Sequence, residues 1–224
     1  MKIIFLFLKH TSELILRSPI YYLSVILIGF MDFFMLMKGF NTIDANKAIF
    51  LNIFYGILGS HSIIFITIFA SEIFLVEKRN GIDSFLLSMP VKLFEILIGK
   101  VLGLSLISFL SSLVVFYIVS LFKIPLVNIF NFDILIAILI IYLISFFYSL
   151  IIGMSICVSK NPTMVYVVFF FLLSFLMKFF KIDKNYSQDL YFLHITNIYK
   201  IIILFVFSLI IYKLLFNKKR FLES

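Results

Sequence analysis

The chain has 224 residues, of which 63% are apolar and only 13% are charged, and its formal net charge is +8. Soluble domains have roughly half apolar and a quarter charged residues, so this composition excludes an ordinary soluble enzyme and indicates an integral membrane protein. In such a protein, the basic excess is expected to set topology and to contact lipid headgroups, and we expect a lipid bilayer and no nucleic acid among the partners.

The first segment, residues 2–17, is predicted to form a helix that lies in the membrane interface. At helical spacing its charged side chains fall on one narrow stripe, which consists of Lys2, Lys9, Glu13 and Arg17. The alternative is an extension of the first membrane span. Pro19 argues against that alternative, because the residue before a proline is pushed out of the helical region.

Six apolar runs follow, each long enough to cross a hydrocarbon layer of ~30 Å as a helix of about 20 residues. They are residues 20–37, 49–75, 101–122, 134–158, 163–180 and 198–216. Helices are expected because lipid cannot satisfy backbone polar groups, and the alternation of a membrane barrel is absent. The sequence therefore predicts an all-α polytopic membrane protein with a single transmembrane domain over residues 1–224.

An even number of spans places both termini on one side of the membrane. The segments expected on that side carry more lysine and arginine than those on the other side, which favours cytoplasmic termini in a multi-pass protein of the plasma membrane. The longest segment expected outside is 181–197. Inside the spans, small residues recur at helical spacing, as in Gly99 and Gly103, and such faces are expected to pack closely against other helices.

The segment between the second and third spans, residues 76–92 (the elbow), gathers charge, glycine and proline. Asn80-Gly81 is a turn signal, Asp83 can cap a short helix, and Pro90 can open the next helix. The elbow is therefore predicted to be a helix–break–helix lever. Its apolar side chains are Phe85, Leu86, Leu87 and Met89. They need a partner surface, because burying each is worth about 1.5–3 kcal/mol.

The elbow resembles the signature of the permeases of the type-2 ABC transporter family, which are six-span exporter subunits. The residues that match in order and spacing are Glu77, Gly81, Leu86, Leu87, Pro90, Val91, Gly99 and Lys100. Ile82 stands where the family usually has threonine, and Asp83 where glutamate is common. The span number and the interfacial first helix extend the resemblance over nearly the whole chain.

The resemblance implies a division of labour between subunits. Two permeases, identical or paralogous, would face each other, and each would dock its elbow, called the coupling helix, on a separate ATPase. The implied contact set is Glu77, Gly81, Asp83, Phe85, Leu86, Leu87, Met89 and Pro90. The sequence has no G-x-x-x-x-G-K-[ST] phosphate loop, so ATP and magnesium are expected in the partner subunit and no cofactor in this chain.

Three polar residues inside the spans are candidates for a translocation path or a subunit interface: Asp32, Asn52 and His61. An ionisable group such as Asp32 is expensive in lipid and is a functional candidate, whereas a lone histidine usually packs with a hydrogen bond. A second hypothesis is therefore a self-sufficient carrier or channel that uses Asp32 and His61. We expect no enzyme, because no metal-ligand cluster and no nucleophile–base pair is apparent.

Overall fold

The computed structural model describes residues 2–39, 47–81, 92–120, 132–159, 161–177 and 190–215, and every regular element in these ranges is helical. The elements are α1 (Lys2–Arg17), α2 (Pro19–Gly39), α3 (Lys47–Ala70), the π-helical segment η1 (Ser71–Val76), α4 (Glu77–Arg79), α6 (Leu93–Ser120), α7 (Phe132–Val158), α8 (Pro162–Met177) and α9 (Leu190–Leu215). The all-α prediction is confirmed for the described residues.

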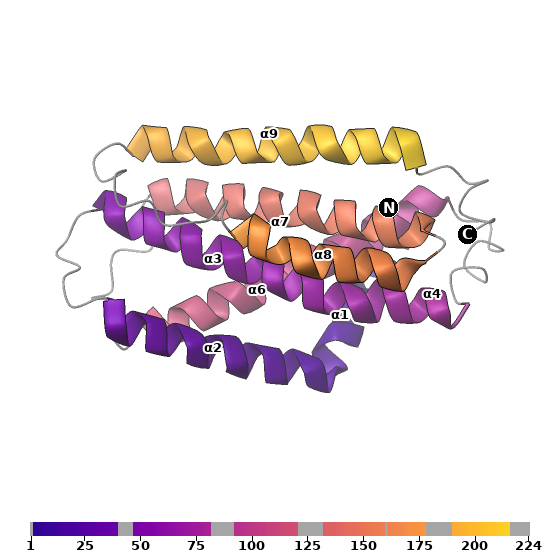
Figure 1. The fold of residues 1–224 in the computed structure, drawn as a ribbon, viewed down its shortest axis with the longest axis horizontal. Helices are drawn as coiled ribbons and strands as arrows, with labels where there is room; N and C mark the ends of the chain where they lie inside the picture. Colours follow the sequence, from indigo (N-terminus) through magenta and orange to yellow (C-terminus); the bar gives the residue numbers. More distant parts are fainter. Residues whose placement is uncertain are drawn as a thin grey trace.

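The long helices form a bundle whose axis is the longest dimension of the molecule, with α2 along one side and α9 along the opposite side in this view (Figure 1). α4 ends and α6 begins at the same end of the bundle, which we call the elbow end. α3, α7 and α9 begin at the other end, which we call the far end (Figure 1).

Helix α1 is separated from α2 by a sharp bend at the elbow end. α1 stops at Arg17, α2 starts at Pro19, and the two axes differ by 68°. The Ser18 hydroxyl accepts a hydrogen bond from the Ile20 amide at 3.2 Å, and Pro19 occupies the first helical position, where its missing N–H costs little. The predicted break between the first segment and the first span is therefore present.

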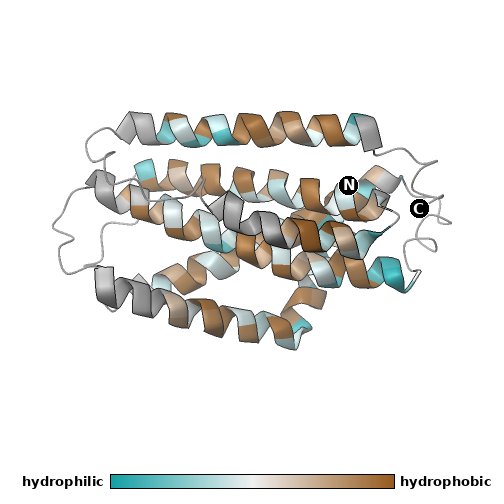
Figure 2. Ribbon diagram, in the orientation of Figure 1, coloured by the Kyte–Doolittle hydropathy of each residue, from teal (hydrophilic) through white to brown (hydrophobic). Residues whose placement is uncertain are grey.

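Within the described residues, four helical stretches are long and apolar enough to cross a membrane, or five if the bent pair α1–α2 forms one span. The four are Ile53–Arg79, Phe94–Ile118, Phe132–Cys157 and His194–Lys213. Hydrophobic residues dominate the bundle, and the strongly hydrophilic patch at α4 marks the elbow end (Figure 2). The chain is thus a multi-pass membrane protein. The described part of α8, Pro162–Met177, has 16 residues, which is shorter than the about 20 residues that a membrane-spanning helix needs.

Several helices extend beyond the apolar runs seen in the sequence. The second run continues without a break through η1 and α4 to Arg79, and α6 already begins at Leu93, where the sequence reading placed the return of the elbow. α9 begins at Leu190, so the last part of the expected outer segment 181–197 is helical. Charged residues at span ends do not stop a helix, because their side chains reach water or neighbouring polar groups.

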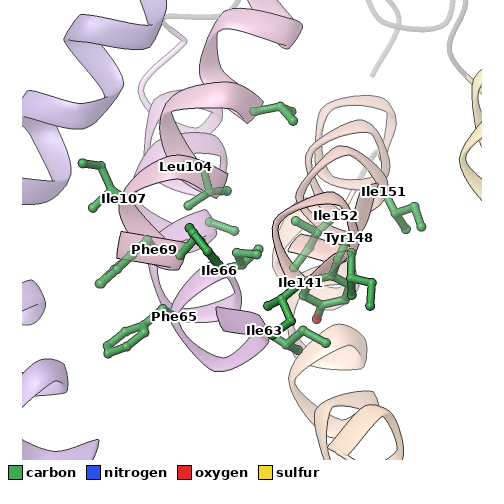
Figure 3. Close-up of a cluster of buried hydrophobic side chains, with 14 of the residues drawn as sticks. Ile63, Phe65, Ile66, Phe69, Leu104, Ile107, Ile141, Tyr148, Ile151 and Ile152 are labelled. Atoms are coloured by element: carbon green, nitrogen blue, oxygen red, sulfur yellow. The ribbon is translucent and has the colours of Figure 1, made fainter. Parts of the chain in front are cut away.

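Helix α3 is the central element of the bundle. In the most apolar part of the stretch Ile53–Arg79, which begins in α3, 78% of the residues are buried, against 17% in the corresponding part of His194–Lys213 in α9. The core joins α3 to α6 and α7 (Figure 3), through Ile63, Phe65, Ile66 and Phe69 of α3, Leu104 and Ile107 of α6, and Ile141, Tyr148, Ile151 and Ile152 of α7. Tyr148 keeps a polar partner inside this core, because its hydroxyl lies 2.9 Å from the Thr67 hydroxyl.

The predicted small-residue faces lie at the closest helix contacts. A Cβ atom on Gly99 would lie 2.6 Å from the Phe7 Cβ, and one on Gly103 would lie 2.8 Å from the Thr11 Cβ. α1 therefore rests directly on the first turns of α6. A Cβ on Gly153 of α7 would lie 2.8 Å from the Phe74 ring of η1, so this glycine makes room for a buried aromatic side chain.

Candidate functional site

The candidate site is the base of the elbow, where η1 and α4 end the long second helix. η1 has an extra residue in its turn relative to an α-helix, which rotates the side chains that follow it; π turns of this kind are often found at functional sites. Three consecutive charged residues come next: Glu77, Lys78 and Arg79. Each of them binds a different helix of the bundle.

Glu77 forms a buried ion pair with Lys100 of α6. The two residues are 8% and 3% exposed, and the Lys100 ammonium donates a short hydrogen bond to Glu77 Oε2. The same ammonium lies 5.8 Å from the centre of the Phe74 ring, a distance that suits a cation–π contact. Charges at this depth are stable only as a pair, since each alone would lose its hydration without compensation.

Lys78 binds the carboxyl end of α7. Its ammonium donates to the carbonyl oxygens of Cys157 at 2.6 Å and Ser159 at 2.8 Å, with Ile156 at 3.4 Å. The last carbonyls of a helix have no partner inside the helix and carry partial negative charge. A lysine from a neighbouring element therefore satisfies these groups and fixes the end of α7 to α4.

Arg79 reaches the start of α8. Its guanidinium donates to the Thr163 hydroxyl at 2.7 Å, one residue after Pro162 opens the helix. Asn161 caps the same turn, because its side-chain oxygen accepts from the Met164 amide at 3.1 Å. Together with Lys78, Arg79 ties the turn between α7 and α8 to the base of the elbow.

The helix ends after Arg79 in the turn that the sequence predicts at Asn80-Gly81. Gly81 has a φ of 70°, and its amide donates to the Lys78 carbonyl at 3.2 Å. This left-handed conformation is the usual end of a helix and strains any residue with a Cβ.

We expect Gly81→Ala to lower the free energy of unfolding by about 1 kcal/mol. Thermal unfolding in detergent would measure the change, and an unchanged midpoint would contradict the assignment.

Only part of the predicted contact set lies in the described residues. Glu77 and Gly81 are placed, and Glu77 points into the bundle toward Lys100. The others lie outside the described residues: Asp83, Phe85, Leu86, Leu87, Met89 and Pro90. Of the intramembrane candidates, His61 is a buried residue of α3, whereas the side chains of Asp32 and Asn52 also lie outside the described set.

The sequence reading missed the contacts that hold this site together. It assigned Glu77 to the contact set for an ATPase and Lys100 to the motif that resembles the permease signature, and it did not pair the two residues. The available signal is weak, because Lys100 stands directly before the apolar run 101–122, where a lysine reads first as a topology signal.

Comparison of the chain with family models, with curated proteins and with solved structures finds no match.

Proposed function

We propose that the chain is the permease subunit of an ATP-driven exporter and that its elbow is the docking site for a separate ATPase subunit. The observation that carries this proposal is the ion pair between Glu77 and Lys100. It joins residues that are 23 positions apart in the chain and lie on either side of the elbow. The two described ends of the elbow are therefore held together at one fixed point, as a lever that transmits a push requires.

The contacts at the base of the elbow connect it to three helices of the bundle. Glu77 binds α6, Lys78 binds the end of α7, and Arg79 binds the start of α8. A push on the elbow is then delivered to several helices at once, because ion pairs and charge-assisted hydrogen bonds resist separation in a site with little water. In the proposed mechanism, this push reorients the spans and moves a substrate outward.

Helix α1 supplies a second surface at the same end. It packs on Gly99 and Gly103 of α6, directly beside Lys100, and its charged stripe faces away from α6. In the proposed topology, α2 and α8 complete six spans. The termini, the elbow and α1 are cytoplasmic, and the protein resides in the plasma membrane, where cytoplasmic segments carry the larger share of basic residues.

The energy source is proposed to be another chain. The sequence lacks the phosphate loop by which ATPases cradle the nucleotide, so ATP and magnesium would bind the partner subunit. A second permease, identical or paralogous, would complete the assembly.

Charged substitutions at the apolar centre of the elbow test the proposal. We expect Phe85→Glu combined with Leu87→Glu to abolish co-purification with the ATPase subunit, because a charge in a docking groove loses its hydration without gaining a partner. The measurement is the ATPase recovered per permease after affinity purification in mild detergent.

The matched control is Asn80→Glu, which adds a negative charge in the exposed turn at the start of the elbow, away from Phe85 and Leu87 in the sequence, and is expected to leave the complex intact. Membrane insertion of all variants is checked by their yield in the membrane fraction. Unchanged recovery of the ATPase with the double variant would remove the docking assignment. Labelling of Asn80→Cys in intact cells by a membrane-impermeant thiol reagent would also remove it, because the elbow would then be external.

A further inference from the structure

A second buried polar cluster lies at the far end of the bundle, away from the elbow. His194 of α9 is 9% exposed, and its Nδ1 lies 2.7 Å from the Tyr55 hydroxyl of α3. Its Nε2 lies 4.0 Å from the Asp133 carboxylate at the start of α7. One imidazole thus faces a hydroxyl from one helix and a carboxylate from another, and it joins α9 to both.

Helix α9 depends on such contacts more than the other long helices do. Its described buried side chains are His194, Asn197, Ser208 and Ile211, of which three are polar, and most of the remaining surface is exposed and apolar. In lipid, apolar surface gives little drive for helix association, so close packing and polar contacts decide whether two helices stay together. The position of the outer part of α9 therefore depends strongly on His194.

We propose that His194 is a proton-binding site that fastens the far end of α9 to α7 and α3 when it is charged. In the neutral form, Nδ1 accepts from the Tyr55 hydroxyl and Nε2–H faces Asp133. On taking up one proton from water, Nδ1 becomes a donor to the Tyr55 oxygen, and the imidazolium forms an ion pair with the Asp133 carboxylate. In this geometry Nε2 has no hydrogen-bond partner among the described residues and lies 4.0 Å from the Asp133 carboxylate, so the proton adds a charge attraction between α9 and α7 that the neutral form lacks.

The groups around His194 fit this assignment. The Asp133 side chain is 24% exposed, which leaves a route for protons from water, and it supplies the counter-charge that a buried imidazolium needs. Tyr55 is the titratable group that α3 turns toward the imidazole. On α9 itself, Lys200 is the nearest described charged residue, and its ammonium donates to the Asn197 side-chain oxygen at 2.7 Å. The proposal does not depend on the exporter function.

The experiment measures the separation of α9 and α7 at the far end as a function of pH. Spin labels replace Leu135 of α7 and Ile198 of α9, both exposed, in a background in which Cys157, the single cysteine of the chain, is serine. Because histidine normally changes charge in this range, we expect the short-distance population to rise by roughly twofold or more between about pH 8 and about pH 5.5.

Two variants and one control decide the outcome. His194→Gln keeps a hydrogen-bonding side chain without a titratable proton, and Asp133→Asn removes the counter-charge; both are expected to abolish the pH response. His10→Gln, which removes an exposed histidine of α1, is expected to retain it. An unchanged distance in the parent protein, or a full response in His194→Gln, would overturn the proposal.

A second measurement does not rely on a change at His194. The chain has three histidines, so a protein that carries His10→Gln and His61→Gln has His194 as its single imidazole. Nitrogen-15 NMR of labelled histidine then reports its protonation directly. We expect the imidazole to gain its second N–H in the range of about pH 5 to 8, and an imidazole that stays neutral throughout that range would overturn the proposal.

Discussion

Replacing Lys100 with methionine is expected to lower the free energy of unfolding by about 3–5 kcal/mol, because it leaves the Glu77 carboxylate buried without a counter-charge. The pair lies at the junction of α4 and α6, where Lys100 is 3% exposed. Methionine fills much of the same volume, so the loss reports the missing charge more than a cavity. Glu77→Gln is expected to cost a similar amount, since it leaves the Lys100 ammonium buried without a counter-charge.

The double variant separates the value of the pair from the cost of an unpaired charge. The combination of Glu77→Gln and Lys100→Met removes both charges, so no unpaired charge is left buried at this place. Most of the lost stability is therefore expected to return. Unfolding in detergent by heat or by denaturant measures all three variants. If the double variant costs as much as the two single variants added together, the two residues act independently. The ion pair assigned to the base of the elbow is then wrong.

An exposed ion pair in the same chain provides the control. Glu13 lies 3.9 Å from Lys9 and 4.0 Å from Arg17 on the surface of α1, and all three side chains are largely accessible. Exposed pairs of this kind are worth about 0.2–1 kcal/mol each, so Glu13→Gln is expected to cost far less than Lys100→Met. A cost comparable with that of Lys100→Met would show that detergent conditions, and not burial, dominate the measurement.

The helical fold could be predicted from the sequence because each apolar run is a local signal. A run of apolar residues needs about 20 positions to cross the hydrocarbon layer, and lipid then requires a helix. The break between α1 and α2 was also local, since it depends on the adjacent residues Ser18 and Pro19. The turn at Asn80-Gly81 is a third example, because the left-handed backbone of Gly81 follows from one pair of residues.

The contacts at the elbow base could not be predicted because they join residues that are distant in the chain. Lys78 and its acceptor on Ser159 are 81 positions apart, and a basic residue after a span reads first as a topology signal. The π-helical turn adds to the difficulty, since it changes which side chains face the bundle without leaving a mark in the apolar pattern. The cluster around His194 was missed for the same reason, because 139 positions separate it from Tyr55.

The packing of α1 on α6 is expected to fail when either glycine at the contact gains a side chain. The neighbours of a Cβ at Gly99 include the Ile4 carbonyl oxygen at 2.8 Å, and those at Gly103 include the Leu8 carbonyl oxygen at 2.9 Å. Backbone atoms of α1 cannot rotate away as a side chain can, so the whole helix has to move. We expect Gly99→Ala or Gly103→Ala to cost about 1–3 kcal/mol, as overpacked cores do.

Gly29→Ala is the matched control, because a Cβ there would lie 3.8 Å from the Val115 side chain, an ordinary contact, and it is expected to be neutral or slightly stabilising. Thermal unfolding ranks the variants, and spin labels on the exposed residues Phe5 and Leu110 report whether α1 has left α6. Equal effects at Gly29 and Gly103 would mean that α1 is held by its apolar surface alone. Because Lys100 lies between the two contact glycines in the sequence, a displaced α1 is also expected to loosen the ion pair between Glu77 and Lys100. The stability loss of a glycine substitution and that of a substitution in the ion pair should then not be additive.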